Sequence, residues 1–394
     1  MAKATATGAS FRKDVARAGE EAARDALSRL GTRRPTFGFV FASPDHDLGI
    51  ALGEVRRVTG CNDLLGCSTA GALTEAGPIA DGVAVMLVAS SDSSHRMDFG
   101  RGLRSAYGPL ARQFNQSASE AKKPARLAGR RHLTTVLLTD GLAGTGEQLV
   151  HEMFESSQSS SQIVGGAAGD DGRFLRTMVG AGRECSEDAA AALHVFDSKP
   201  WGVGVNHGLR PTTKPLRVTR SRGNVIHTIE GEPAFDMYRR HAAESGVTLT
   251  RDNAPAYLVA NELGVHFFDT LARARAPLAV GADGSLTCAA PVPEGSFVSI
   301  LDGVPEIMIE AAKSAAVEAR QRLGEGRAAG VLLFDCICRG MILKHALRDE
   351  IDAVRSVFGD VPVAGFLTYG EIARYGGRLD GWHNATAVVV AVPA

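Results

Sequence analysis

The chain has 394 residues, which is more than one ordinary hydrophobic core accommodates, so two domains are expected. Hydrophobic residues make up 44% of the chain and charged residues 22%, as in ordinary soluble globular proteins. The net charge is −1 and both signs are mixed along the chain. We therefore expect neither a nucleic-acid groove nor a surface for anionic membranes.

The cysteines and the first residues indicate a reducing, cytoplasmic setting. The six cysteines are sparse and form no Cys-x-x-Cys pair, which argues against a disulfide framework and against a four-cysteine zinc site. The first ten residues are small and polar and lack the apolar segment of a signal peptide. No apolar run approaches the length of a membrane span, so no membrane association is expected.

The N-terminal part reads as a mixed α/β domain over residues 34–210, after a tail and one helix in residues 1–33. Apolar residues at helical spacing predict the helices, and short apolar runs predict the strands. Residues 82–90 and 94–100 are expected to pair with each other. The predicted helices are 11–30, 47–58, 107–122 and 147–155, and the predicted strands are 36–42, 63–66, 82–90, 94–100, 133–139, 162–164, 190–196 and 201–208.

The second domain, residues 211–394, opens with a strand-rich segment that predicts an antiparallel sheet. The closing part returns to alternating helices and strands. The predicted helices are 233–244, 305–323 and 347–358, and the predicted strands are 216–219, 225–229, 256–260, 264–269, 276–280, 285–290, 298–301, 331–334, the apolar run ending at 363–364, and 385–392.

Several predicted strands open into turns that are rich in glycine and polar residues. Residues 66–71, 165–172 and 365–370 are of this kind, and residues 335–340 form a fourth turn that carries Arg339. Loops of this type at strand ends commonly carry binding sites in α/β proteins. The segment 140–146 has the layout of an anion site at a helix N-terminus, but its glycine spacing matches neither the dinucleotide fingerprint nor the P-loop, so an ordinary βα turn is favoured.

Two of these turns resemble each other. Residues 66–71 and 365–370 share glycine, threonine and glycine at identical spacing, and both follow a helix and a short strand. Three identities in six residues are explained equally well by chance, by common turn chemistry and by a distantly repeated fold. If the repeat is real, the two turns can face a common cleft.

Four motifs in order resemble those of the FIST sensory-domain family. Leu65–Gly71 and Val164–Asp171 resemble its N domain, whereas Phe334–Gly340 and Val363–Ile372 resemble its C domain. Asp335 departs mildly from the family pattern, which has a small residue at that place. The resemblance spans residues 35–375, and no kinase, methyl-accepting or cyclase domain is attached.

The resemblance implies a signal-input protein that binds a small molecule, an amino acid or a related metabolite, and signals to a separate protein. It also implies an alternative, since some stand-alone members are haem proteins that sense nitric oxide and regulate a histidine kinase. For haem b, His207 is the candidate axial ligand because it ends an apolar strand near the domain junction. A hydrogen-bonded structural role is the simpler interpretation of this histidine.

The turns carry groups that suit an α-amino acid. Arg339 can hold a carboxylate with its two-pronged guanidinium, and Glu371 can accept from an ammonium group. Arg339 and Glu371 can equally pair with each other or cap helices. The full set of candidate ligand-binding residues is Cys67, Ser68, Thr69, Gly166, Asp170, Arg339, Thr368, Tyr369 and Glu371.

A cysteine-dependent enzyme is the remaining alternative. Cys67 lies in a glycine-flanked turn where main-chain N–H groups can activate a thiol. No partner histidine is identified, and the segment lacks the Gly-x-Ser-x-Gly frame of a serine nucleophile. Cys336 and Cys338 can form a redox pair, although small buried thiols are more usual. The sequence therefore favours a non-catalytic sensor of two mixed α/β domains, with mixed, partly antiparallel sheets flanked by helices.

Overall fold

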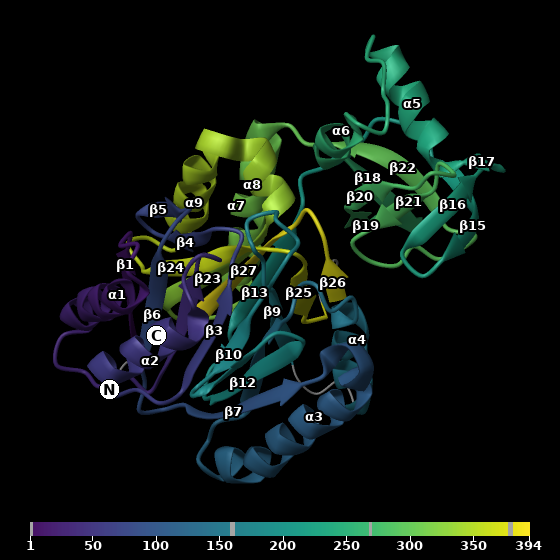
Figure 1. The fold of residues 1–394 in the computed structure, drawn as a ribbon. Coiled ribbons are helices and arrows are strands. Elements are labelled where there is room, and N and C mark those ends of the chain that lie inside the picture. Colours follow the sequence, from purple (N-terminus) through teal and green to yellow (C-terminus); the bar gives the residue numbers. More distant parts are fainter. Residues whose placement is uncertain (1–2, 158–161, 268–269, 377–380) are drawn as a thin grey trace.

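The computed structural model describes residues 3–157, 162–267, 270–376 and 381–394. These residues form a main body and a smaller lobe, residues 210–302, which projects from one corner of the body (Figure 1). The main body consists of three units that contain equivalent elements in the same order.

The first two units fill residues 4–197. The first unit contains β1 (Ala4–Ser10), α1 (Val15–Leu30), β2 (Phe37–Ala42), α2 (Leu48–Thr59), β3 (Leu64–Ser68), β4 (Ala72–Thr74), β5 (Gly77–Ile79) and β6 (Val83–Ala89). The second unit contains β7 (Ser94–Arg101), α3 (Leu103–Leu127), β8 (His132–Thr139), α4 (Gly146–Ser156), β9 (Gln162–Ala167), β10 (Val179–Ala181), β11 (Glu184–Ser186) and β12 (Ala189–Asp197).

The third unit is interrupted by the lobe after its first strand. It contains β13 (Gly202–Asn206), α7 (Pro305–Arg322), β23 (Ala328–Cys336), α8 (Ile337–Leu343), the 3₁₀ turn η1 (Lys344–Ala346), α9 (Leu347–Ser356), β24 (Val363–Thr368), β25 (Glu371–Arg374), β26 (Gly381–His383) and β27 (Ala387–Pro393). The lobe contains β14 (Arg210–Pro211), β15 (Leu216–Arg222), β16 (Val225–Ile229), β17 (Glu232–Pro233), α5 (Ala234–Glu244), α6 (Ala254–Ala260), β18 (Asn261–Phe267), β19 (Thr270–Arg275), β20 (Pro277–Val280), β21 (Leu286–Cys288) and β22 (Phe297–Asp302).

The three sheets of the body have one strand order in the described residues. They run β1-β6-β2-β3-β10-β11, β7-β12-β8-β9-β25-β26 and β13-β27-β23-β24-β4-β5. Each contains one parallel pair, β2–β3, β8–β9 or β23–β24, and the other pairings are antiparallel. Each sheet ends in a hairpin from another unit, because the first unit gives β4–β5 to the third, the third gives β25–β26 to the second, and the second gives β10–β11 to the first. This cyclic exchange ties the N-terminal and C-terminal parts into one body.

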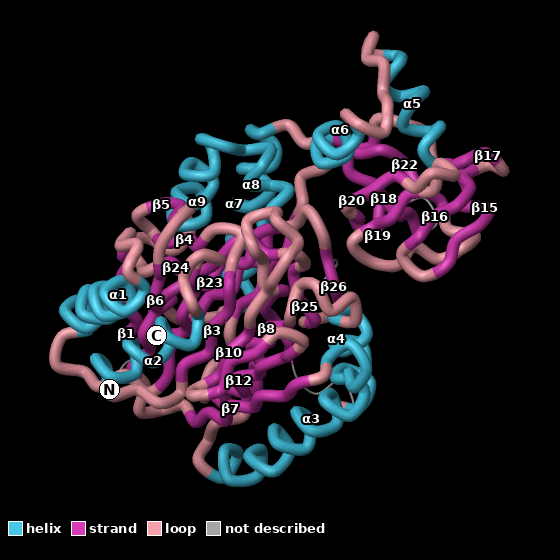
Figure 2. The backbone as a smooth tube through the Cα atoms, viewed as in Figure 1, coloured by secondary structure: helices cyan, strands magenta, loops and turns pink. Residues whose placement is uncertain are grey.

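The sheets enclose a central apolar core, and the helices cover their outer faces (Figure 2). Phe39, Leu193 and Phe366, one from each sheet, are buried in this core. The helices α1 and α2 pack on the first sheet through small residues such as Ala18 and Ala22. Burial on both faces explains why central strands such as β27 are almost continuously apolar.

In the turns at residues 66–71, 165–172 and 365–370, the first glycine allows the parallel strand pair of its sheet to form. A Cβ atom at any of these glycines would collide with a main-chain carbonyl oxygen of the neighbouring strand, so only glycine fits. The Cβ-to-oxygen distances would be 2.6 Å from Gly66 to Val40, 1.9 Å from Gly165 to Leu137 and 1.7 Å from Gly365 to Leu333. The equivalence of these three glycines extends the similarity of two turns to a structural repeat of three units.

The mixed α/β fold class is confirmed, and several local predictions are wrong. Strands β6 and β7 do not pair with each other, since β6 lies between β1 and β2 and β7 pairs with β12. Residues 256–260 belong to helix α6 rather than to a strand, because Pro255 starts a helix and Leu258 is buried against the lobe. The first residues form strand β1 rather than a tail. The predicted strand 264–269 corresponds to β18, and residues 268–269 lie outside the described residues.

Candidate functional site: the turns and the cavity beside them

Three of the predicted turns meet in space through main-chain hydrogen bonds. The turn after β3 pairs with the turn after β24, and both contact the turn after β9. The N–H groups and the oxygens that they contact are Ala70 to Leu367 (3.1 Å), Leu367 to Gly71 (2.8 Å), Gly169 to Ser68 (3.0 Å), Ala167 to Gly370 (2.8 Å) and Tyr369 to Ala167 (3.1 Å). The cyclic strand exchange thus brings together segments that lie up to 300 positions apart.

Asp170 and Tyr369 form a polar link between two of these turns. The Tyr369 hydroxyl donates to the Asp170 carboxylate, which also accepts from the main-chain N–H groups of Phe174 (2.9 Å), Leu175 (2.6 Å) and Arg176 (2.8 Å). Burial would raise the pKa of Asp170, but these hydrogen bonds outweigh it and lower the pKa. The carboxylate therefore holds the loop after β9 in place, with Phe174 stacked on the Tyr369 ring at 4.9 Å between ring centroids.

Arg339 is fully buried and makes its polar contacts within the protein. Its guanidinium pairs with Asp335 (Nε to Oδ1, 2.8 Å) and Glu350 (Nη2 to Oε2, 2.5 Å). It also donates to the main-chain oxygens of His207 (2.6 Å) and Met308 (3.0 Å). The fork that could hold a ligand carboxylate is thus occupied by contacts that join α8 to α7, α9 and the strand-end segment after β13.

Most other candidate residues also lie inside the body. Thr368 donates to Glu371 (2.5 Å), which also accepts from the N–H of Thr386 (3.1 Å), and burial raises the pKa of Glu371 well above its ordinary value. Ser68 donates to the oxygen of Gly169 (2.9 Å). The remaining three residues are also enclosed. Cys67 is buried, which raises its pKa well above normal, and Thr69 donates to the main-chain oxygen of Ala42 (3.2 Å). Gly166 packs on Thr368.

His207 lies at the end of β13, and its Nδ1 accepts from the N–H of Leu209 (2.9 Å). Its main-chain oxygen accepts from Arg339. These contacts give it the hydrogen-bonded role that the sequence favoured. No histidine is among the described residues that line the cavity beside the turns.

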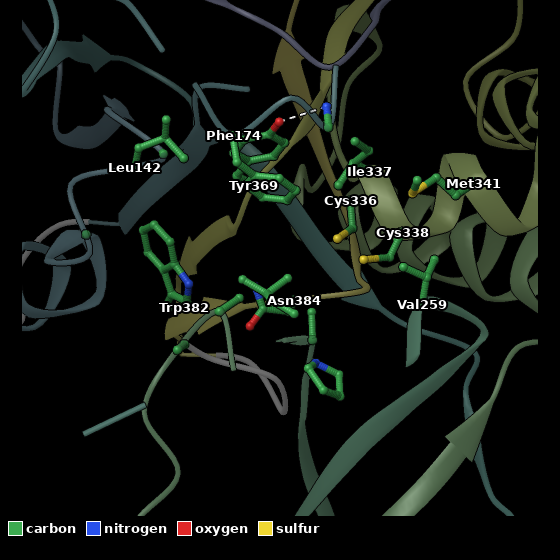
Figure 3. Close-up of a pocket in the computed structure, with 18 of the residues that line it drawn as sticks. Leu142, Phe174, Val259, Cys336, Ile337, Cys338, Met341, Tyr369, Trp382 and Asn384 are labelled. Atoms are coloured by element: carbon green, nitrogen blue, oxygen red, sulfur yellow. Dashed lines mark hydrogen bonds between the residues drawn. The ribbon is translucent and has the colours of Figure 1, made fainter. Parts of the chain in front are cut away.

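A cavity of about 790 Å³ lies between the body and the lobe, next to the meeting point of the turns (Figure 3). Its wall is mainly apolar and combines the ends of body strands with α6, β20 and the segment after β21 of the lobe. The labelled apolar side chains of Figure 3 surround an open space and come from both parts of the molecule. They include Leu142, Phe174, Val259, Ile337, Met341, Tyr369 and Trp382. Volume and composition match small-molecule sites, which are typically concave and apolar with few polar groups.

A few polar groups lie on this mainly apolar wall. Asn384 is 1% exposed, and its Oδ1 atom has no hydrogen-bond partner among the described residues. Glu147 accepts from Arg273 and Arg275 through Oε1, whereas its buried Oε2 has no partner within the described part of the chain. Lys344 supplies one positive charge on the wall. Unpartnered buried acceptors are costly unless a ligand or water donates to them.

Of the predicted site residues, Tyr369 lines this cavity, and Ser68 and Asp170 line a smaller recess of about 200 Å³ on the other side of the loop after β9. Sequence reasoning missed Asn384, Trp382 and the lobe residues. It did single out the segment 140–146, most of which lies on the cavity wall, although as an ordinary turn. The position of this segment could have marked it as part of the site. It follows β8, which in the second unit is equivalent to β23, and the turn after β23 was a predicted site turn.

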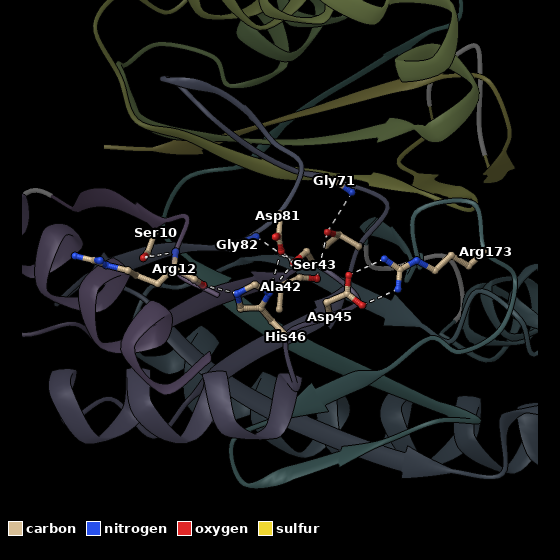
Figure 4. A network of polar contacts seen from close by, with 11 residues as sticks. Ser10, Arg12, Ala42, Ser43, Asp45, His46, Gly71, Asp81, Gly82 and Arg173 are labelled. Atoms are coloured by element: carbon tan, nitrogen blue, oxygen red, sulfur yellow. Dashed lines mark hydrogen bonds and ion pairs between the residues drawn. The ribbon is translucent and has the colours of Figure 1, made fainter. Parts of the chain in front are cut away.

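A polar network near the N-terminus contains serine, histidine and aspartate, but these residues are not arranged as in a catalytic triad (Figure 4). His46 Nδ1 contacts both Ser43 Oγ (2.8 Å) and Asp81 (3.4 Å), and Nε2 contacts the main-chain oxygen of Arg12 (2.7 Å). A serine triad needs serine and aspartate on opposite ring nitrogens. Ser43 also accepts from the N–H of Gly82 (3.0 Å), so the network fastens the segment after β1 to the body.

Glu262, in β18 of the lobe, should make the stability of the protein depend on pH. The side chain is buried, and burial raises its pKa well above the ordinary value although the Cys338 side chain lies within hydrogen-bond reach. The unfolded chain releases this proton near pH 4 while the folded protein keeps it, so this group lowers the free energy of unfolding as pH rises above about 4. Glu262→Gln should therefore be more stabilising at pH 8 than at pH 4, as measured by urea denaturation at the two pH values.

The control for this prediction is Glu325→Gln, which changes an exposed glutamate. It should leave the difference between the two pH values unchanged. An equal effect of Glu262→Gln at pH 4 and pH 8 would show that Glu262 is not protonated in the folded protein.

Comparison with known proteins identifies the family. Residues 36–232 match the FIST N domain model and residues 234–374 match the FIST C domain model. An uncharacterized protein of Mycobacterium tuberculosis (strain H37Rv) is 24% identical over 398 residues, covering 96% of this chain and 95% of that protein. An uncharacterized protein of Methanocaldococcus jannaschii is 30% identical over 82 residues, which are 21% of this chain and 16% of that protein.

None of the helices in the described residues combines the length and the apolar character needed to cross a membrane. No group of three or more histidine, cysteine, aspartate or glutamate side chains in the described part of the chain is arranged to hold a metal ion. With both domain models matched in order over nearly the whole sequence, the chain belongs to the FIST family, whose domains are associated with sensory functions and signal transduction.

Proposed function

We propose that this protein is a signal-input protein that binds a small, mainly apolar metabolite in the cavity between the body and the lobe. The observation that carries the proposal is the cavity itself, about 790 Å³ in volume and walled by residues of both the N-terminal and the C-terminal parts of the chain. A cavity of this size suits a small organic molecule. The family's association with sensory functions supports the same conclusion.

The polar groups on the wall narrow the chemistry of the ligand. The Asn384 Oδ1 and Glu147 Oε2 atoms are acceptors without partners in the described residues, so the ligand should carry hydrogen-bond donors such as an ammonium group. Lys344 can attract a carboxylate. An amino acid with an aromatic or large aliphatic side chain, or a related metabolite, meets these demands. In this proposal Asn384 and Glu147 make the polar contacts to the ligand. Arg339 does not touch the ligand but holds α8, which lies on the cavity wall, in position.

Binding would be read out through the lobe. The lobe is joined to the body by two chain crossings, near residues 207–213 and 302–304, and shares the cavity wall with it. A ligand that contacts both parts favours the arrangement in which they are closest, by as much as it prefers that arrangement. A separate signalling protein, such as a histidine kinase, would recognise this arrangement.

Ala256 offers a test because its exposed side chain lies on the cavity wall, on α6. Ala256→Phe should fill part of the cavity and leave the fold intact. In thermal-shift screening with apolar amino acids and related metabolites, wild type should be stabilised by at least one compound, by about 2.7 kcal/mol at a hundredfold excess over its Kd. The same compound should no longer stabilise Ala256→Phe.

The matched control is Ala243→Phe, the same substitution at an exposed position of α5 that does not line the cavity. It should retain the full shift. A compound that stabilises wild type and Ala256→Phe equally binds elsewhere, and this result would reject the cavity as the binding site.

A further inference from the structure

Two cysteines lie side by side on the wall of the cavity. Cys336 is the last residue of β23, and Cys338 lies in the first turn of α8. Both side chains are buried, with 2% of Cys336 and 5% of Cys338 exposed, and both line the cavity. Figure 3 shows their sulfur atoms close to each other. A molecule in the cavity would therefore contact both thiols.

The surroundings of the two thiols differ. Burial would raise the pKa of Cys336, but hydrogen bonds from the Cys338 thiol, from the main-chain N–H groups of Cys338 and Ala385 and from Glu371 outweigh it and bring the pKa to about 7. The hydrogen bond to Cys336 and burial raise the pKa of Cys338 well above normal. Of the two thiols, Cys336 is therefore the one that gives up its proton more readily.

A buried acid stands behind this pair. Glu262 is 1% exposed and lies within hydrogen-bond reach of the Cys338 side chain. Its raised pKa keeps it protonated, so it does not add a negative charge that would oppose a thiolate.

We propose that Cys336 is a nucleophile that forms a thioether with an α,β-unsaturated carbonyl compound in the cavity. The sulfur attacks the β-carbon, the C–S bond forms, and the π electrons of the C=C bond move toward the carbonyl. The proton that Cys336 has given up returns to the α-carbon, so the adduct is neutral and no other reactant is consumed. The proposal rests on the proposed function, since the reactive compound must enter the same cavity.

The cavity wall favours this class of reactant. A soft thiolate prefers a soft carbon electrophile, and an apolar wall with a few polar groups suits an organic molecule that carries one carbonyl group. The other cysteines lack these conditions. Cys67 is fully buried away from the cavity, and burial raises the pKa of the partly exposed Cys185 to about 11.

N-phenylmaleimide, an apolar α,β-unsaturated imide, tests the proposal with the full chain. After brief treatment at neutral pH, intact-mass and peptide analysis should show one adduct, located on Cys336. The adduct should be lost in Cys336→Ala, retained in Cys185→Ala, and formed more slowly in Ala256→Phe. Cys185 is the matched control because it is more exposed but has the higher pKa.

An adduct on Cys185 in preference to Cys336, or no adduct on the folded protein, would overturn the proposal. Equal rates for wild type and Ala256→Phe would also overturn it, because the reactant would then not pass through the cavity. The proposed function is judged separately by reversible ligands. If such a ligand still stabilises wild type and Cys336→Ala but not Ala256→Phe, the binding site stands even when Cys336 is unreactive.

Discussion

Arg339→Ala is expected to lower the free energy of unfolding by about 3–5 kcal/mol, as for other buried charges that lose their partner. The substitution leaves Glu350 buried without its ion pair and removes the hydrogen bonds to the oxygens of His207 and Met308. It also leaves a cavity where a large side chain, 0% exposed, had packed. Urea denaturation followed by circular dichroism measures the change.

Arg24→Ala is the control, since Arg24 makes an exposed ion pair with Glu20 on α1. Its effect should stay below about 1 kcal/mol. If Arg339→Ala costs no more than this control, the buried ion pairs do not hold α8 against α7 and α9, and the account of Arg339 as a structural residue fails.

Gly365→Ala should have a comparably large effect for a different reason. The added Cβ would lie 1.7 Å from the main-chain oxygen of Leu333, so β23 and β24 must separate for it to fit. This parallel pair carries both the turn with Tyr369 and the strand end with Cys336. We expect a loss of at least about 3 kcal/mol in the free energy of unfolding, or failure to fold, because main-chain atoms cannot move aside as side chains do.

Gly53→Ala is the matched control for this prediction. Gly53 lies within α2, and a Cβ atom there meets nothing within 4 Å. Alanine is the better helix former, so this variant should be as stable as wild type or more stable by up to about 1 kcal/mol. A Gly365→Ala variant with wild-type stability would contradict the close approach of the two strands.

The sequence predicted the components of the site better than their positions. Glycine-bounded turns after apolar strands indicated a shared meeting point, and Ser68, Asp170 and Tyr369 do lie at two faces of one loop. Whether a polar side chain at a strand end points to a ligand or into the body depends on packing partners far along the chain. Arg339 shows this, because its partner Glu350 and the oxygens of His207 and Met308 come from three other segments.

Local sequence patterns could not predict the cyclic strand exchange. Strands β4 and β10 have three residues each, and their partners β24 and β3 lie more than 100 positions away. Periodicity describes one segment at a time and carries no information on such pairing. The same limit explains α6, whose aromatic and β-branched residues resemble a strand until its packing in the lobe is known. The division of the chain at residue 210 remains a prediction.

The central claim is that the cavity between body and lobe binds the ligand, and Trp382 reports on it directly. The chain has two tryptophans, and Trp201 is buried in the central core of the body, so Trp201→Phe leaves Trp382 on the cavity wall as the remaining one. Titration of this variant with a stabilising compound should give a saturable change in tryptophan fluorescence, with the same Kd as the thermal shift. A compound that binds and stabilises this variant without any change in Trp382 fluorescence would contradict the claim.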